Sequence, residues 1–328
     1  MRIGPILELP GLLDEFGVHP HEVLAAAGID PRVFKNPDNL IPFESRLRLL
    51  NVCARRTRCS HFGLLLGQRT TLHSFGLIGF MALNSPDVGS ALNGLIRFLH
   101  LHVQGSAVTL EIREEMAFMG YRVYQASSES VTQLVEAGVA ASFNALRELC
   151  GSEWQPVEVC FSHRKPSVWS PFQKVFNAPV RFDAEKNGIH FPAHWLKQRV
   201  RIADPELLRL LRIQIDELER SHGDDFLEQV RRMVHVSIPA QNCSAGQVAR
   251  LFSIHSRTLH RYLRAYGTSF REIKDQCSFD IARQMLENSD TDLYDIAVLL
   301  GYSDRRAFSR AFRRWSGTTP TRWRAEHR

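Results

Sequence analysis

Apolar residues recur every three or four positions through the last third of the chain, and this spacing predicts a series of short amphipathic helices. Ser244, with Gln247 three residues later, forms a capping-box pattern, which is typical of a helix start. The helix that follows carries Val248, Ala249 and Phe252 on its inner face. The pattern breaks at residues 253–256, so this helix is predicted to be short.

A second helix is predicted over residues 256–266, where Leu259 and Leu263 are four positions apart and Gly267 provides a stop signal. Two short helices joined by a tight turn form a helix-turn-helix motif. The small side chain of Ala249 lies where the two helices must cross closely. The sequence therefore places a first helix-turn-helix at about residues 244–266.

A longer helix is predicted over residues 269–288. Ser269 and Glu272 form its capping box, and one side of the helix is apolar. The apolar residues of that side are Phe270, Ile273, Cys277, Ile281, Met285 and Leu286. About 18 residues at about 1.5 Å each give a length of roughly 27 Å.

The pattern of the first motif is then repeated. Ile296 and Ala297 lie on a short helix that ends at Gly301, and Phe308 and Phe312 mark another helix after a turn at residues 302–304. Ala297 follows its counterpart alanine in the first motif by 48 residues. We therefore predict a second helix-turn-helix at about residues 292–315, with the longer helix as a linker between the two motifs.

The first 220 residues mix helical and strand patterns. Helical spacing is visible in residues 20–27, 43–56, 88–102 and 131–149, alternation in 103–124 predicts a β-hairpin that turns at Glu114 and Glu115, and short strands are expected within 157–191. The predicted fold class is an N-terminal α+β domain followed by a C-terminal all-α double helix-turn-helix joined by a linker helix. The expected domains are residues 1–222 and 226–328, because the sequence of residues 222–225 interrupts the apolar pattern.

A helix is also predicted over residues 204–221, just before this linker. Its apolar stripe is heptad-like for about two turns. The stripe comprises Leu207, Leu208, Leu211, Ile215 and Leu218. Packing within its own domain and dimerisation would both satisfy such a stripe, and we expect the chain to form a homodimer.

The charge of the chain is divided unevenly. Residues 239–328 contain 15 Lys and Arg against 9 Asp and Glu, whereas residues 1–238 contain 26 of each, so the net charge of +6 comes entirely from the C-terminal segment. Of those 15 cations, 14 are arginine, whose planar guanidinium suits phosphates and guanine edges. This composition suggests binding to a polyanion, and a solvated basic surface without a ligand is the alternative.

The second helix of each motif has a polar face of one charge sign. With the leucines and phenylalanines inward, the outward side chains are Arg257, His260, Arg261 and Arg264 in the first motif and Arg305, Arg306, Ser309, Arg310 and Arg313 in the second. Neither face carries a carboxylate after its first turn. The linker helix with its flanking turns approaches the length of one turn of B-DNA, about 34 Å. We therefore predict that these side chains bind double-stranded DNA, with the two helices in successive major grooves.

Composition and motifs exclude several other classes of protein. The 44% hydrophobic and 23% charged content is typical of globular proteins, the longest apolar run (75–83) is too short for a membrane span, and the first residues do not resemble a secretory signal. We therefore expect a cytoplasmic protein that does not contact a membrane. The six cysteines form no C-x-x-C pair and are expected to be packed, reduced thiols.

No catalytic motif is evident, so we predict that the chain is not an enzyme and has no catalytic residues. G-x-S-x-G, P-loop, G-x-G-x-x-G and H-E-x-x-H sequences are absent. His100 and His102 are two positions apart and point to different sides of a helix, and the spacing of Cys53 and Cys59 does not match a zinc-cysteine site. No metal and no cofactor are expected.

The C-terminal segment resembles the AraC/XylS family of transcription regulators. Residues 296–303 and 308–314, with Gly317, Pro320 and the pair Trp323-Arg324, look like the C-terminal signature of that family, and residues 257–263 and 267–270 resemble its first helix-turn-helix. The resemblance implies base contacts by Arg257, His260 and Arg261 in the first motif and by Arg305, Arg306, Ser309 and Arg310 in the second.

The first motif departs from the family pattern at its turn. The family usually has glycine in the turn and serine before the recognition helix, whereas this sequence has Ser253 and His255. Either Ser256 or His255 is therefore expected to be the cap, and the register of the helix is left open.

Fragments of the N-terminal part resemble the effector domain of the ornithine and arginine branch of the same family. They are residues 27–30, 62–64 with Gly67, 75–79 and 177–182. The resemblance implies a sensing and dimerisation domain and names no ligand. An apolar pocket lined by residues 75–83 and 92–101 is the candidate effector site, with plain core as the alternative.

The expected function is an effector-responsive activator of transcription, whose partners would be operator DNA, a small-molecule effector and RNA polymerase. One alternative is a DNA-binding regulator without a small-molecule ligand, controlled by its abundance or by a protein partner. A second alternative is an enzyme fused to a DNA-binding domain.

Overall fold

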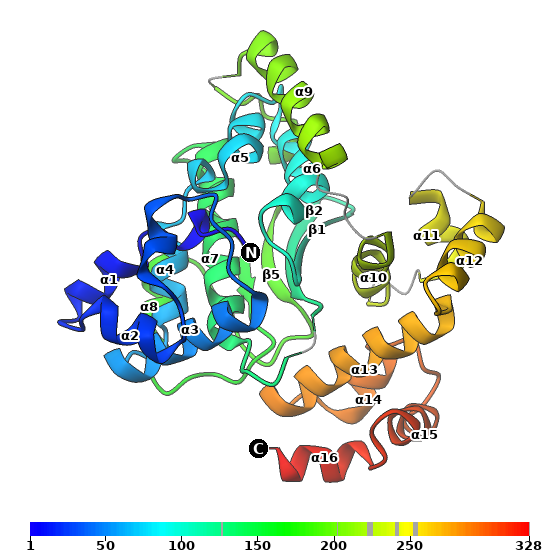
Figure 1. Ribbon diagram of the computed structural model, residues 1–328. Coiled ribbons are helices and arrows are strands. Elements are labelled where there is room, and N and C mark those ends of the chain that lie inside the picture. Colours follow the sequence, from blue (N-terminus) through cyan, green and yellow to red (C-terminus); the bar gives the residue numbers. More distant parts are fainter. Residues whose placement is uncertain (126, 202, 222–225, 240–242, 252–254, 328) are drawn as a thin grey trace.

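The computed structural model describes the chain except for residues 126, 202, 222–225, 240–242, 252–254 and 328 (Figure 1). The N-terminal part surrounds a small sheet with helices, and the C-terminal part is helical (Figure 1). This arrangement confirms the predicted fold class. The linker expected at residues 222–225 and the first turn's Ser253 lie outside the described residues.

The helices of the N-terminal part include those predicted from the periodicity of the sequence. They are α1 (Leu9–Glu15), α2 (Pro20–Ala26), α3 (Phe43–Thr57), α4 (Phe62–Arg69), α5 (Gly76–Leu83), α6 (Val88–Phe98), α7 (Thr132–Cys150), α8 (Ser170–Phe176) and α9 (Pro205–Ser221). Of these, α1, α4, α5 and α8 are additional to the prediction. The predicted helix at 88–102 ends in a 3-10 turn, Leu99–Leu101. Its first turn is fixed by Asp87, whose carboxylate accepts a hydrogen bond from the backbone of Ser90 at 2.7 Å.

The sheet has the strand order β1-β2-β5-β3-β4. Its strands are β1 (Ser106–Arg113), β2 (Met116–Val123), β3 (Glu158–Cys160), β4 (Val180–Arg181) and β5 (Asn187–Pro192). Neighbouring strands are antiparallel except β3 and β4. The predicted hairpin is present as β1 and β2, and its turn uses a positive φ of 53° at Glu114.

Helix α7 packs against the sheet and lies very close to α4. A Cβ atom on Gly63 would lie 2.0 Å from the carbonyl oxygen of Gln133, and one on Gly67 would lie 2.3 Å from that of Ala137. Only glycine permits α4 to approach α7 this closely. The two glycines of the family-like fragment therefore have a packing role.

Helix α9 differs from the predicted single stripe. Leu208, Leu211 and Ile215 are buried in the core of the N-terminal part, but Leu207 is 41% exposed. Leu207 lies at the edge of the buried side, because successive helical residues point about 100° apart. The exposed apolar residues Leu210 (48%) and Ile213 (42%) continue from it around the helix.

The C-terminal helices surround a hydrophobic core of their own. They are α10 (Phe226–Ser237), α11 (Ala245–Leu251), α12 (Ser256–Ala265), α13 (Phe270–Asn288), α14 (Leu293–Leu299), α15 (Arg305–Ser316) and α16 (Pro320–Glu326). Helices α10 and α16 were not predicted from the sequence. Helix α10 contributes Val230 and Val234 to this core, Ile238 directly after it joins them, and the helix also contacts β1.

The two parts are in direct contact. The buried ring of His235 on α10 lies 5.9 Å from the ring of Tyr124 at the end of β2. The backbone N–H of Arg164 donates a hydrogen bond to the carbonyl of Asn288 at 3.0 Å, and its guanidinium pairs with Asp290 at 3.1 Å. The N-terminal sheet is thus covered partly by helices of the C-terminal part (Figure 1).

Candidate nucleic-acid interface

The first helix-turn-helix unit consists of α11 and α12. Ser244 and Gln247 form the predicted capping box at its start, with hydrogen bonds of 3.1 and 3.3 Å. Leu259 and Leu263 are fully buried, so the opposite side of α12 faces outward. The inner position expected for Phe252 lies outside the described residues.

The two ends of α12 define the register of this helix. His255 is the N-cap residue, with φ −74° and ψ 149°, and Ser256 is the first helical residue. The side chain of His255 makes no capping hydrogen bond. At the other end Gly267 has a φ of 73°, and the N–H of Thr268 donates to the carbonyl of Leu263 at 3.0 Å, as in a Schellman motif.

The second helix-turn-helix unit consists of α14 and α15, and both of its helices have side-chain caps. Asp292 accepts a hydrogen bond from the N–H of Tyr294, and Asp304 accepts one from the N–H of Ala307, each at 2.7 Å. The bond from Ala307 is the main cause of the lowered pKa of Asp304. Gly301 ends α14 with a φ of 78°, as its position in the sequence predicts.

Aromatic packing fixes α15 against α13. Phe308 and Phe312 are fully buried. The ring of Phe279 on α13 lies 5.5 Å from that of Phe312, and Trp323 on α16 lies 5.8 Å from both rings. Such tilted and edge-to-face contacts hold ring positions more firmly than aliphatic packing of the same area. The orientation of α15 therefore depends on α13 and α16 together.

The structure places the predicted DNA-binding residues on two outward faces. Exposed side chains are Arg257, His260, Arg261, Arg264, Arg305, Arg306, Arg310 and Arg313, and Ser309 is half-buried. Neither the seven arginines nor His260 forms an ion pair within the part of the chain that the structure describes. The neighbouring Arg314 differs, because it pairs with Asp275 of α13 at 3.0 Å.

Helix α13 joins the two units. It has 19 residues, which corresponds to about 28 Å, and it starts at the predicted capping box of Ser269 and Glu272. Helix α12 leads into its N-terminal end, while α15 and α16 pack along it (Figure 1). The two basic faces are therefore carried by one continuous element.

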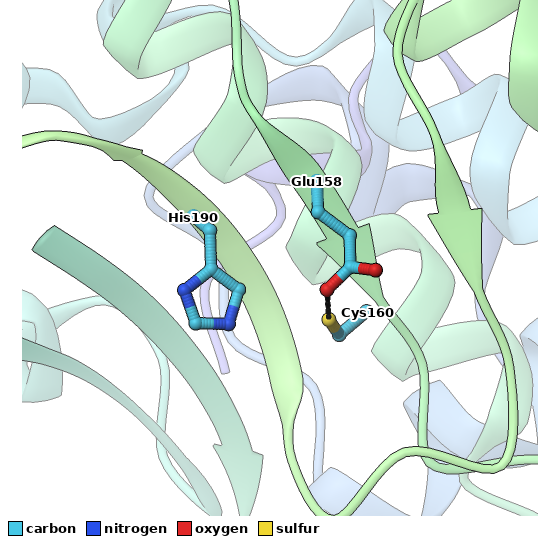
Figure 2. A group of neighbouring side chains, drawn as sticks. All are labelled: Glu158, Cys160 and His190. Atoms are coloured by element: carbon cyan, nitrogen blue, oxygen red, sulfur yellow. Dashed lines mark hydrogen bonds between the residues drawn. The ribbon is translucent and has the colours of Figure 1, made fainter. Parts of the chain in front are cut away.

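A group of possible metal ligands lies elsewhere, on the sheet. Glu158 and Cys160 on β3 and His190 on β5 have donor atoms within 4.8 Å of one another (Figure 2). The Cys160 thiol donates to a Glu158 carboxylate oxygen at 3.2 Å. The sequence analysis missed this group because His190 reaches it only through the pairing of β5 with β3.

The surroundings of this group favour a hydrogen-bonded cluster over a metal centre. The guanidinium of Arg181 lies 2.9 Å from the Glu158 carboxylate and 3.3 Å from the Cys160 sulfur. Burial raises the pKa of Cys160 to about 12, and a metal needs the thiolate form. A fixed positive charge beside two of the three donors opposes a cation, so the residues present fit a metal poorly.

An apolar cavity lies inside the N-terminal part, between α3, α6, α7 and β2. The volume of the cavity that is open to the centre of a water-sized sphere is about 80 Å³. The two segments expected to form a pocket contribute Phe75, Leu95 and Leu99, but α7 and β2 supply much of the remaining wall. The alternative interpretation as plain core holds for Ile78 and Met81, which are buried outside the wall of the cavity.

Two basic helix-turn-helix faces beside a domain with an internal cavity define the class of the molecule, a DNA-binding transcription regulator. Residues 17–200 match the family described as the N-terminal arabinose-binding domain of AraC transcription regulators, and residues 248–326 match a helix-turn-helix domain family. The chain belongs to the AraC family of transcription regulators. This is a family of regulators, not of enzymes.

Relatives resemble the chain over nearly its whole length. The ornithine utilization regulator of Pseudomonas aeruginosa is 26% identical over 330 residues, which cover 98% of this chain and 96% of the relative. The regulator VirS of Mycobacterium tuberculosis is 26% identical over 96% of this chain and 93% of its own. The crystal structure of CdpR from P. aeruginosa is 22% identical, covers 93% of this chain and 96% of its own, and has a TM-score of 0.47.

Among the residues that the structure describes, no helix combines the length and the apolar character needed to cross a bilayer.

Proposed function

We propose that this regulator is an effector-responsive activator that inserts α12 and α15 into successive major grooves on one face of its operator. The observation that carries the proposal is the pair of exposed arginine faces on α12 and α15, two helices that α13 joins. The major groove returns to the same face of B-DNA about every 34 Å, and the length of α13 with its flanking turns approaches that distance.

The two recognition helices divide their contacts between bases and phosphates. Base edges are assigned to Arg257, His260 and Arg261 on α12 and to Arg305, Arg306, Ser309 and Arg310 on α15. Arginine pairs with the O6 and N7 acceptors of guanine, so the second half of the operator should be rich in guanine. Arg264 and Arg313, one turn further along their helices, are assigned to backbone phosphates.

The regulator is proposed to act as a homodimer through α9. Leu207, Leu210 and Ile213 form an exposed apolar row on this helix, while its other side is packed in the domain. An exposed contiguous apolar face is stabilised when a second copy covers it. Sedimentation should show a dimer that L210E converts to monomer, whereas the neighbouring exposed change R209A should leave it dimeric.

The remaining roles follow from this arrangement. Residues 1–222 are proposed to sense the effector and to dimerise, and residues 226–328 to bind DNA and contact RNA polymerase in the cytoplasm. The internal cavity supports a small-molecule effector, and one relative is named an ornithine utilization regulator. A regulator without a ligand is the second candidate.

The test of the DNA-binding assignment is Arg310→Ala. Loss of a base contact should weaken binding to the operator by about 1–3 kcal/mol and binding to unrelated DNA far less. The matched control is Arg322→Ala on α16, which removes an exposed arginine that pairs with Glu326 at 2.6 Å. An equal loss on both DNAs would make Arg310 a phosphate contact.

The effector is tested by thermal unfolding against a panel of metabolites. A ligand at 100 times its dissociation constant adds about 2.7 kcal/mol to the free energy of unfolding. A rise in Tm with one class of metabolite supports sensing. No rise with any class supports the ligand-independent regulator.

A further inference from the structure

One wall of the internal cavity contains a buried positive charge. Arg46 lies on the inner face of α3 between the apolar residues Phe43, Leu47 and Leu50, and only 4% of its surface is exposed. One terminal nitrogen of its guanidinium donates to the backbone carbonyl of Arg2 at 3.0 Å. Its Nε atom, also buried, has no hydrogen-bond partner among the described residues.

No carboxylate balances this charge. Within the part of the chain that the structure describes, Arg46 forms no ion pair, and the phenol of Tyr121 acts on its charge. That phenol already donates its hydrogen bond to Ser106 at 2.9 Å. The α-amino group of Met1 also lies near Arg46, but burial, and then Arg46, lower its pKa to about 6, and it donates to the carbonyl of Ile41 at 2.7 Å. Burial lowers the pKa of Arg46 to about 10, which leaves it charged at neutral pH. A buried charge without a partner is costly for folding, so its presence needs another explanation.

The rest of the cavity wall is almost entirely apolar. Besides Arg46 and Tyr121, its only lining side chains with a polar group are Thr70 and Ser142. Thr70 already donates to the carbonyl of Pro5 at 3.0 Å. The free space of about 80 Å³ corresponds to roughly five to eight groups the size of a water molecule or a methylene. The cavity therefore suits a small molecule with one anionic end and an apolar body.

We propose that the effector is an apolar monocarboxylate of roughly five to eight carbon atoms, whose carboxylate binds Arg46 inside this cavity. The inference rests on the proposed effector-responsive function and names its ligand class. Arginine presents two parallel N–H groups to a carboxylate, and in an apolar environment such a pair is strong. A diamino acid is disfavoured, because its second ammonium group would meet an apolar wall and the charge of Arg46.

The position of the cavity connects it to the DNA-binding helices. Met119 and Tyr121 on β2 line the cavity, while Phe118 and Arg122 on the same strand border a space against α10, α13 and α14. This follows from the alternation of side chains along a strand. A ligand that moves Tyr121 therefore acts on the strand that supports the C-terminal helices.

The direct test is to measure the binding of hexanoate and octanoate to the full-length protein, by calorimetry and by the rise in Tm. Octanamide, which has the same length without the charge, should bind at least about tenfold more weakly. Arg46→Met should reduce octanoate affinity to that of octanamide, and Arg46→Lys should retain part of it. Bound octanoate should also change the affinity of the protein for its operator.

Two controls separate binding from folding. Arg48→Met makes the same change on the same helix at a half-exposed side chain that pairs with Glu129, and it should leave octanoate binding unchanged. Arg46→Met should unfold at a Tm no lower than wild type, because it removes a buried charge. If it fails to fold, Ala141→Leu keeps the guanidinium, fills part of the cavity from α7 and should shift the preference from octanoate to hexanoate.

The outcomes distinguish this inference from the function on which it rests. Equal octanoate binding by wild type and Arg46→Met would overturn the assignment of the carboxylate site. Failure of every carboxylate, together with a Tm rise for another metabolite class, would overturn the inference and leave the effector-responsive function standing. Failure of every metabolite would overturn both, while DNA binding would still be judged from Arg310→Ala.

Discussion

The two helix-turn-helix units have the same plan but are stabilised differently. In the second unit Asp304 caps α15, and a cluster of aromatic rings from α13, α15 and α16 holds it in place. In the first unit the cap position of α12 is His255, which makes no capping bond, and those of its buried residues that the structure describes are aliphatic. The first unit also packs on α10, which contacts the N-terminal sheet.

This difference suggests different tasks for the two units. The second unit carries its own stabilising contacts and offers a preformed recognition helix to DNA. The first unit depends more on α10 and so on the domain that holds the cavity. A signal from the cavity should therefore reach α12 more readily than α15.

The largest effect is expected from Phe312→Ala in the aromatic cluster. Removing a fully buried phenylalanine side chain should cost about 3–5 kcal/mol and loosen α15 from α13. Urea unfolding measures the loss, and near-ultraviolet circular dichroism should lose the signal of Trp315 and Trp323. Tyr294→Ala, at an exposed position of the same unit, should change stability by less than about 0.5 kcal/mol. A similar small change for Phe312→Ala would show that the cluster does not stabilise the second unit.

The next effect concerns pH and the buried His235 on α10. Burial, and then the positive charge of Arg122, lower the pKa of His235 well below its usual value, so the imidazole is neutral in the folded protein. The unfolded chain takes up this proton near pH 6.5, so stability should fall as the pH decreases below that value, by at most about 1.4 kcal/mol per pH unit. Unfolding curves between pH 5 and 7 measure the slope.

Two variants isolate the contribution of His235 to that slope. His235→Leu should reduce the dependence on pH, whereas Tyr294→Ala, which removes no histidine, should leave it as in wild type. Equal slopes for wild type and His235→Leu would contradict the role of the buried imidazole.

The smallest effect concerns the N-cap residues of α12 and α15. His255→Asn gives α12 a side-chain acceptor and should stabilise the protein by about 1 kcal/mol. Asp304→Ala removes the acceptor from α15 and should lower the Tm of the protein by about 2 °C. Thermal unfolding followed by circular dichroism measures both. A destabilising His255→Asn would mean that α12 starts elsewhere in solution.

Much of the fold could be predicted from the sequence because the signals are local. The capping boxes at Ser244 and Ser269 and the stop signals at Gly267 and Gly301 all lie where the sequence indicates. The outward faces of α12 and α15 were also predictable, since two buried residues per helix fix the direction of the others.

Features that depend on distant contacts were not predicted. The stripe of α9 was assigned to one side, but Leu207 is left exposed at its edge because the neighbouring core covers only Leu208, Leu211 and Ile215. Arg46 gave a local signal, a cation within the apolar stripe of α3, but its lack of a counter-charge depends on strands and helices far along the chain. The cluster around Cys160 likewise depends on strand pairing.

Methylation interference on the operator is the direct test of how α12 and α15 bind DNA, because dimethyl sulfate modifies guanine N7 in the major groove. With one C-terminal unit bound, we expect two groups of interfering guanines on the same face, centred about 10–10.5 base pairs apart. Arg310→Ala should remove the interference in one group and leave the other. A single group, or two groups on opposite faces of the duplex, would contradict the placement of α12 and α15 in successive major grooves.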